Sequence, residues 1–203
     1  MNRRGLLKKT LGGAALLAVA GAVPLALRKT RLRPPRGPLQ FFSEAEYSVW
    51  AAVAERILAR EPTPASREPG DFPSAAATEV AERRAPPPSA AEVDVAAKAD
   101  AFLAPLPPGD ARDLKQLLAL FDNALFSLLT GGPPTPFTQM SPEQQDAHLR
   151  AWQQSRLAVR RTGYQALKRL TCAIYFGSPA VYASLGYPGP PVELVKSVLG
   201  ARK

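Results

Sequence analysis

The sequence contains very few of the residues that build metal and catalytic sites. Its 203 residues include one histidine, His148, and one cysteine, Cys172. A zinc site needs further Cys or His ligands at short spacings, and the nucleophile motif G-x-S-x-G is missing. The glycine-rich signatures of nucleotide-binding loops are missing as well. We therefore expect a protein that is not an enzyme and that holds no cofactor or metal, with His148 on the polar, solvated side of its helix.

The single cysteine excludes a disulfide within the chain. A lone thiol is either buried in the fold or paired with another chain. We expect Cys172 to be buried in a helix, and pairing with a second protein is the alternative.

Acidic residues are absent from the first 43 positions, whereas nine of the 26 Lys and Arg lie between Arg3 and Arg36. The 17 basic residues that remain balance the 17 acidic ones, so the body of the chain is formally neutral. The sequence pI of about 10.1 therefore reflects the N-terminal segment. A nucleic-acid-binding protein needs its cations on the folded surface, so the composition argues against that function.

The chain also lacks a long apolar run. Residues 11–27 are apolar and follow a basic stretch, residues 1–10, which is the layout of an export signal. As a helix these 17 residues would be about 26 Å long, shorter than the ~30 Å bilayer core. An A-x-A cleavage site occurs at Ala20-Gly21-Ala22, and an uncleaved membrane anchor is the alternative.

The basic stretch resembles the twin-arginine export motif. The residues that carry this resemblance are Arg3, Arg4, Leu6, Leu7 and Lys8. The twin-arginine machinery exports proteins that are already folded, so the resemblance implies a periplasmic destination, with a membrane tether if the leader stays attached. An ordinary export signal is the alternative.

The body is expected to form one all-α domain over residues 43–191, after a basic, Pro-rich linker at 28–42 and before a tail at 192–203. The 22 prolines cluster between segments of helical periodicity. This pattern predicts a compact bundle of about five to six helices, over residues 44–60, 89–103, 110–129, from 141, 157–176 and 178–186. The leucine-rich segment 110–129 is apolar on more than one face, so we expect it to be the central helix.

Charge is distributed unevenly within the body. Residues 37–146 hold 8 basic and 16 acidic residues, whereas residues 147–192 hold six basic residues and no acid. These six, which include Arg160 and Arg161, could pair with acids of the earlier helices. Alternatively they form a basic patch that docks an acidic partner.

The C-terminal part of the body holds the most distinctive motif, an aromatic pair and Ser-Pro that lead to Leu-Gly-Tyr-Pro-Gly-Pro over residues 175–190. This stretch resembles the ending of the gluconate 2-dehydrogenase subunit 3 family. Its departures are Gly177, where the family often has Thr, and Ala180-Val181-Tyr182 in place of an acidic stretch that ends in Trp. These departures leave the resemblance to the family intact, but they bear on which partner protein the chain binds.

The resemblance implies a non-catalytic small subunit of a membrane-associated dehydrogenase. In that family a flavoprotein of the glucose-methanol-choline type carries FAD, a multihaem cytochrome c accepts the electrons, and the small subunit supplies the export signal for the flavoprotein. The first alternative is a stand-alone exported helical scaffold or cell-envelope protein. The second is an enzyme or haem carrier that works through His148.

The C-terminal motif also suits a docking arm, because proline restricts the free chain and tyrosine is a flat amphipathic anchor. In the alternative arrangement the arm folds back and Tyr187 covers the central helix. The candidate docking residues are Tyr175, Tyr182, Leu185, Gly186, Tyr187, Pro188, Gly189, Pro190 and Pro191, together with Arg160 and Arg161.

Overall fold

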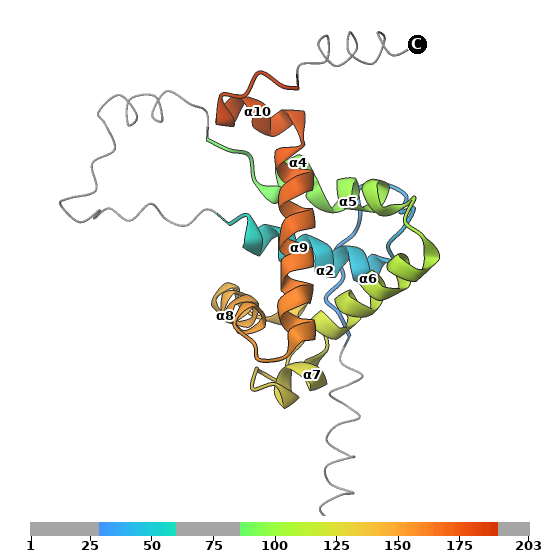
Figure 1. Ribbon diagram of the computed structural model, residues 1–203, viewed down its shortest axis with the longest axis vertical. Coiled ribbons are helices and arrows are strands. Elements are labelled where there is room, and N and C mark those ends of the chain that lie inside the picture. Colours follow the sequence, from blue (N-terminus) through green and yellow to red (C-terminus); the bar gives the residue numbers. More distant parts are fainter. Residues whose placement is uncertain (1–28, 60–85, 191–203) are drawn as a thin grey trace, which may run out of the picture.

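The computed structural model describes residues 29–59 and 86–190. The expected export signal, residues 60–85, Pro191 and the C-terminal tail lie outside the described residues. The elements are α2 (Glu44–Ile57), α4 (Ala90–Val93), α5 (Val95–Leu103), α6 (Pro108–Phe121), α7 (Ala124–Leu129), the 3-10 helix η1 (Phe137–Gln139), α8 (Pro142–Gln153), α9 (Ala158–Phe176) and α10 (Pro179–Leu185) (Figure 1).

The described part of the chain contains no strand, and six of its helices have seven residues or more. The prediction of a compact all-α fold is therefore confirmed. None of these helices has the length and hydrophobicity needed to span a bilayer.

Three helix starts are set by local chemistry that is visible in the sequence. Ser43, Ser89 and Ser141 each accept a hydrogen bond from the backbone N–H three residues later, and the Glu or Gln at that position bonds back to the serine N–H. These capping boxes satisfy backbone donors that the first turn of a helix leaves free. The predicted starts of α2, α4 and α8 are confirmed.

Two of the predicted helices are interrupted by Asp and Asn. Asp94 adopts a left-handed conformation with φ of 54°, which ends α4, and its carboxylate caps α5. Asn123 accepts a 2.8 Å hydrogen bond from the N–H of Phe126 and starts α7. Short polar side chains of this kind compete with helical hydrogen bonding. The prediction of one continuous helix over residues 110–129 is therefore wrong.

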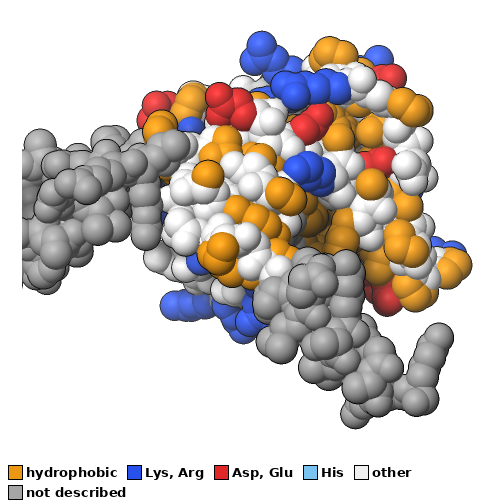
Figure 2. Space-filling model, turned by 90° about the horizontal axis from the view of Figure 1, so that it is seen from above, with side chains coloured by type: hydrophobic (Ala, Val, Ile, Leu, Met, Phe, Trp, Pro, Cys, Tyr) orange, Lys and Arg blue, Asp and Glu red, His pale blue; other side chains and the backbone are white. Residues whose placement is uncertain are grey.

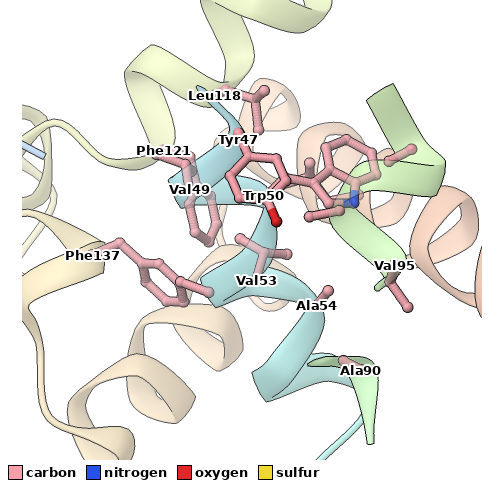
Figure 3. Packing of buried hydrophobic residues seen from close by; sticks show 14 of the residues in the cluster. Tyr47, Val49, Trp50, Val53, Ala54, Ala90, Val95, Leu118, Phe121 and Phe137 are labelled. Atoms are coloured by element: carbon pink, nitrogen blue, oxygen red, sulfur yellow. The ribbon is translucent and has the colours of Figure 1, made fainter. Parts of the chain in front are cut away.

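The centre of the fold is α2 and not the leucine-rich segment. Helix α2 contacts α4, α5, α6, α8, α9 and η1, whereas α6 packs mainly on α2 and α7. Trp50 and Val53 of α2 are fully buried (Figure 3). Ala51, Ala52 and Ala54 have small side chains, so neighbouring helices can lie close to α2. Leu128 and Leu129, at the end of the leucine-rich segment, are exposed.

Residues 29–42, which the sequence assigns to a linker, are packed on the helices. The buried carboxylate of Asp100 accepts hydrogen bonds of 2.7 to 2.9 Å from the backbone N–H groups of Gln40, Phe41 and Phe42. The buried carboxylate of Asp122 accepts a 2.7 Å bond from the Thr30 hydroxyl. The folded body therefore begins close to the end of the expected leader.

Candidate docking surface

The segment after α10 turns back along that helix. Gly186 ends α10 with φ of +66°, a left-handed conformation that glycine adopts without steric cost. The N–H of Tyr187 then donates a 2.9 Å hydrogen bond to the carbonyl of Tyr182. This six-residue closure is a Schellman motif, and it sends residues 187–190 back over the surface of α10.

Tyr182 is the platform for this C-terminal arm, residues 187–190. Its ring meets the Tyr187 ring edge to face, with 5.0 Å between centroids. A Cβ on Gly189 would lie 3.7 Å from the same ring, so the arm backbone packs directly on it. The Tyr182 hydroxyl donates a 3.1 Å hydrogen bond to the carbonyl of Gly177 at the other end of α10.

The arm leaves much of its surface in solvent. The Tyr187 side chain is 44% exposed, and Leu185, Gly186, Pro188 and Pro190 are exposed too. The arm folds back on its own domain, as in the alternative arrangement, but the ring that Tyr187 meets is that of Tyr182 in α10 and not one in the expected central helix, residues 110–129. Pro191 lies outside the described residues.

Tyr175 occupies a different place from the rest of the motif. Its ring is buried, and its hydroxyl donates a hydrogen bond to the carbonyl of Pro88. Burial raises the pKa of the Tyr175 phenol, and the charge of Glu92 adds to that rise. Tyr175 therefore ties α9 to the segment that precedes α4, and its side chain leaves little surface for a partner.

Helices α8 and α9 and the turn between them carry five exposed cations. Arg150, Arg156, Arg161, Lys168 and Arg169 are exposed, and within residues 29–59 and 86–190 none of them belongs to an ion pair. Arg161 donates instead to the backbone carbonyls of Ser155 and Arg156, at 2.7 and 2.9 Å. Among the described residues, the pairing of these five cations with acids of earlier helices, which was one of the two alternatives, is therefore not found.

Helical periodicity aligns several of these cations. Arg161, Lys168 and Arg169 of α9 point away from the core, as does Phe176. We call these four residues the α9 outer face. Helix α9 is the longest helix described and runs through the middle of the molecule (Figure 1), so this face presents its charge over a long, accessible line.

Arg160 differs from its neighbour Arg161. Only 5% of it is exposed, and its guanidinium carbon lies 5.4 Å from the centroid of the Trp152 ring. Burial lowers the pKa of Arg160, and its Nε atom has no hydrogen-bond partner among the described residues. A cation held over an indole face gains electrostatic stabilisation that partly replaces lost hydration.

His148 is buried, so its predicted place on the solvated side of a helix is wrong. It is 4% exposed and lies among Phe121, Phe137 and Trp152, with ring centroids 5.0, 5.5 and 5.9 Å away. Burial, together with the positive charge of Arg160, lowers the pKa of His148 to about 4. The imidazole is therefore neutral near pH 7.

A sequence signal for this burial did exist. The buried residues of α8 are Gln145, His148, Leu149 and Trp152, which follow the spacing i, i+3, i+4 and i+7 of one helix face. Because Gln145 and His148 are polar, a search that counts only apolar residues does not detect this buried face. Cys172 is a free thiol that is only partly buried on α9.

The described residues contain no group of three or more His, Cys, Asp or Glu arranged to hold a metal ion. The clearest surface features of α9 and α10 are the exposed cations along the α9 outer face and the partly exposed aromatic arm. Both are features that a partner protein can contact.

Comparison with protein families agrees with this reading of the C-terminal motif. Residues 44–189 match the model of gluconate 2-dehydrogenase subunit 3, which is more than half of the chain and spans α2 to the arm. Comparison with curated proteins gave no match, and comparison with solved structures gave none. The chain belongs to the gluconate 2-dehydrogenase subunit 3 family and is an accessory subunit of a dehydrogenase complex.

Proposed function

We propose that this chain is the non-catalytic small subunit of a periplasmic FAD-dependent dehydrogenase of the glucose-methanol-choline type. In this proposal the flavoprotein holds the FAD, a multihaem cytochrome c accepts the electrons, and this chain holds neither group. The twin-arginine leader serves both proteins, because the flavoprotein crosses the membrane as a folded passenger. The family match over residues 44–189 is the observation that carries the proposal.

The α9 outer face supports a docking role. Cations that form no ion pair with the described residues attract acidic surfaces over several ångströms, which speeds encounter and fixes the orientation of the complex. The arm adds apolar contact, because Tyr187 is half exposed and already held by Tyr182. A surface ordered before binding loses less conformational entropy in the complex.

The packing of residues 29–42 supports the escort role. Thr30 is bound to Asp122 and follows the last residue of the apolar run, Leu27, by three positions. A partner that grips the helical body is therefore held close to the leader. Pulling the leader into the export machinery would draw the whole folded complex with it.

The test is to change Arg3 and Arg4 together to lysine and to follow both proteins by cell fractionation. We expect both this chain and its flavoprotein to stay in the cytoplasm, and dehydrogenase activity to disappear from the periplasm. The matched control changes Arg31 and Arg36 to lysine, since these cations lie outside the motif. An active flavoprotein in the periplasm of the Arg3/Arg4 variant would refute the escort role.

A further inference from the structure

Arg160 is the one buried residue in a stretch of exposed chain, because residues 156–159 and 161–162 on either side of it are exposed. Its side chain lies across the Trp152 ring, just beneath this surface. The Nε atom is enclosed and has no hydrogen-bond partner among the described residues. The terminal nitrogens, Nη1 and Nη2, are not enclosed in this way, so they are the part of the guanidinium that a second molecule can reach.

Among the described residues, the charge of Arg160 has no carboxylate beside it. No ion pair within residues 29–59 and 86–190 includes this side chain. Burial lowers the pKa of Arg160, and no acidic group offsets that effect. Proteins seldom enclose a charged side chain without a partner, because the lost hydration is costly and an aromatic face returns only part of it. An enclosed guanidinium in this state indicates that an anion completes the site.

The Trp152 ring is a rigid support for this guanidinium. Its centroid lies 4.7 Å from that of Phe121 and 6.0 Å from that of Phe126. Gly163, three residues after Arg160, lets the ring lie close to α9, since a Cβ at this glycine would be 3.0 Å from Cζ3 of Trp152. The guanidinium is therefore oriented before a partner arrives, which reduces the entropy lost on binding.

The surroundings of Arg160 favour an anion. Arg156 and Arg161 are exposed close to it in the chain. Helix α9 begins without a side-chain cap and with no acidic residue in its first turn, so the positive end of the helix dipole adds to the charge of the arginines. The Lys and Arg side chains on the face shown in Figure 2 stand in solvent, in several separate places. Dissolved ions screen such cations, whereas they screen the enclosed Arg160 much less.

We propose that Arg160 is the anchor of the docking surface and that its Nη1 and Nη2 atoms bind a carboxylate of the dehydrogenase partner, from an aspartate or glutamate side chain. The guanidinium fork matches the two oxygens of a carboxylate, so one such side chain satisfies both terminal nitrogens. A pair enclosed by the interface depends less on salt than a pair at the exposed Arg161. This assignment rests on the proposed function, because it names the group that the partner supplies.

The first test uses the full chain alone, with His148 as the reporter. His148 is the only histidine, and the charge of Arg160 contributes to the low pKa of its imidazole. The chain, labelled with ¹⁵N-histidine, is titrated at pH 7 with a capped tri-glutamate peptide and, as a control, with capped tri-glutamine. We expect a saturable shift of the imidazole nitrogen signals with tri-glutamate only. The shift should persist in Arg161→Gln and be lost in Arg160→Gln. No shift in the unchanged chain, as when an acid of the chain itself occupies the site, would overturn the proposal.

The second test measures binding of the full chain to the flavoprotein at low and at high salt. We expect Arg160→Gln to weaken binding at least about thirtyfold at both salt concentrations, because it removes one partner of a desolvated pair. Arg160→Lys keeps the charge but not the fork, so it should weaken binding by about tenfold. Arg161→Gln is the matched control, and its effect of about threefold or less should disappear at high salt. Urea unfolding of each variant checks that the fold is retained.

Failure of the carboxylate site and failure of the proposed function give different results. A chain that binds tri-glutamate through Arg160 but does not bind the flavoprotein would refute the dehydrogenase partner. A chain that binds the flavoprotein equally well as Arg160→Gln would refute the anchor, while the subunit role stands.

Discussion

Replacement of His148 by glutamine removes the only imidazole of the chain from its aromatic surroundings, Phe121, Phe137 and Trp152. Burial and the charge of Arg160 lower the pKa of the folded-state imidazole to about 4. The unfolded chain has an ordinary histidine with a pKa of about 6.5. The two states therefore bind different numbers of protons between these values.

The direction in which pH changes the free energy of unfolding follows from this difference in proton binding. As the pH falls below 6.5, the unfolded chain takes up a proton that the folded chain does not, so the free energy of unfolding decreases. With folded and unfolded pKa values of about 4 and 6.5, the loss between pH 7.5 and pH 5 is about 2 kcal/mol. It approaches about 3.4 kcal/mol well below pH 4, where both states are protonated.

The assay is urea unfolding of the full chain and of His148→Gln at pH 7.5 and at pH 5. Asp122 acts in the opposite direction, because burial raises its pKa and protonation then favours the folded state as the pH falls. Asp122 is present in both proteins, so its effect cancels when the two pH dependences are subtracted. We expect the unchanged chain to lose about 2 kcal/mol more than the variant. Equal losses would refute a neutral, desolvated imidazole at this position.

Three further predictions concern the docking surface and the N-terminal packing. Reversing Arg161 and Lys168 to glutamate should weaken binding to the dehydrogenase partner at least tenfold at low salt, whereas reversing Arg112, an exposed cation of α6, should leave it nearly unchanged in the same titration. A chain that ends at Gly186 should co-purify poorly with the partner but keep the helical circular dichroism of the intact protein. Asp100→Ala should lower the free energy of unfolding by roughly 3 kcal/mol, because three backbone N–H groups lose their acceptor, and Asp100→Asn should cost less.

Several features of the fold were predictable because their causes are local. Ser43, Ser89 and Ser141 start helices through bonds to groups three residues away, so the sequence shows both partners side by side. The Gly186 turn is similar, since its closing bond joins Tyr187 to Tyr182. The family motif is likewise contiguous in the chain.

Other features were missed because they depend on partners far along the chain. His148 looks like a surface residue until Phe121 and Phe137 enclose it, and the leucines of residues 110–129 suggest a central helix that α2 provides instead. Asp94 and Asn123 are ordinary helix-surface residues by periodicity alone. Their side-chain bonds to nearby N–H groups compete with the helix and interrupt it.

The sequence by itself determined that the chain is helical, where most helices start and to which family it belongs. Tertiary structure alone decided which polar residues are enclosed and which cations lack an ion pair with the described residues. Asp100 receives its backbone donors from positions 58 to 60 residues earlier, and Arg161 faces solvent because no acidic side chain of another described helix reaches it. Helix starts follow from the chain's near neighbours, whereas burial and charge pairing follow from contacts that exist only after the helices have packed.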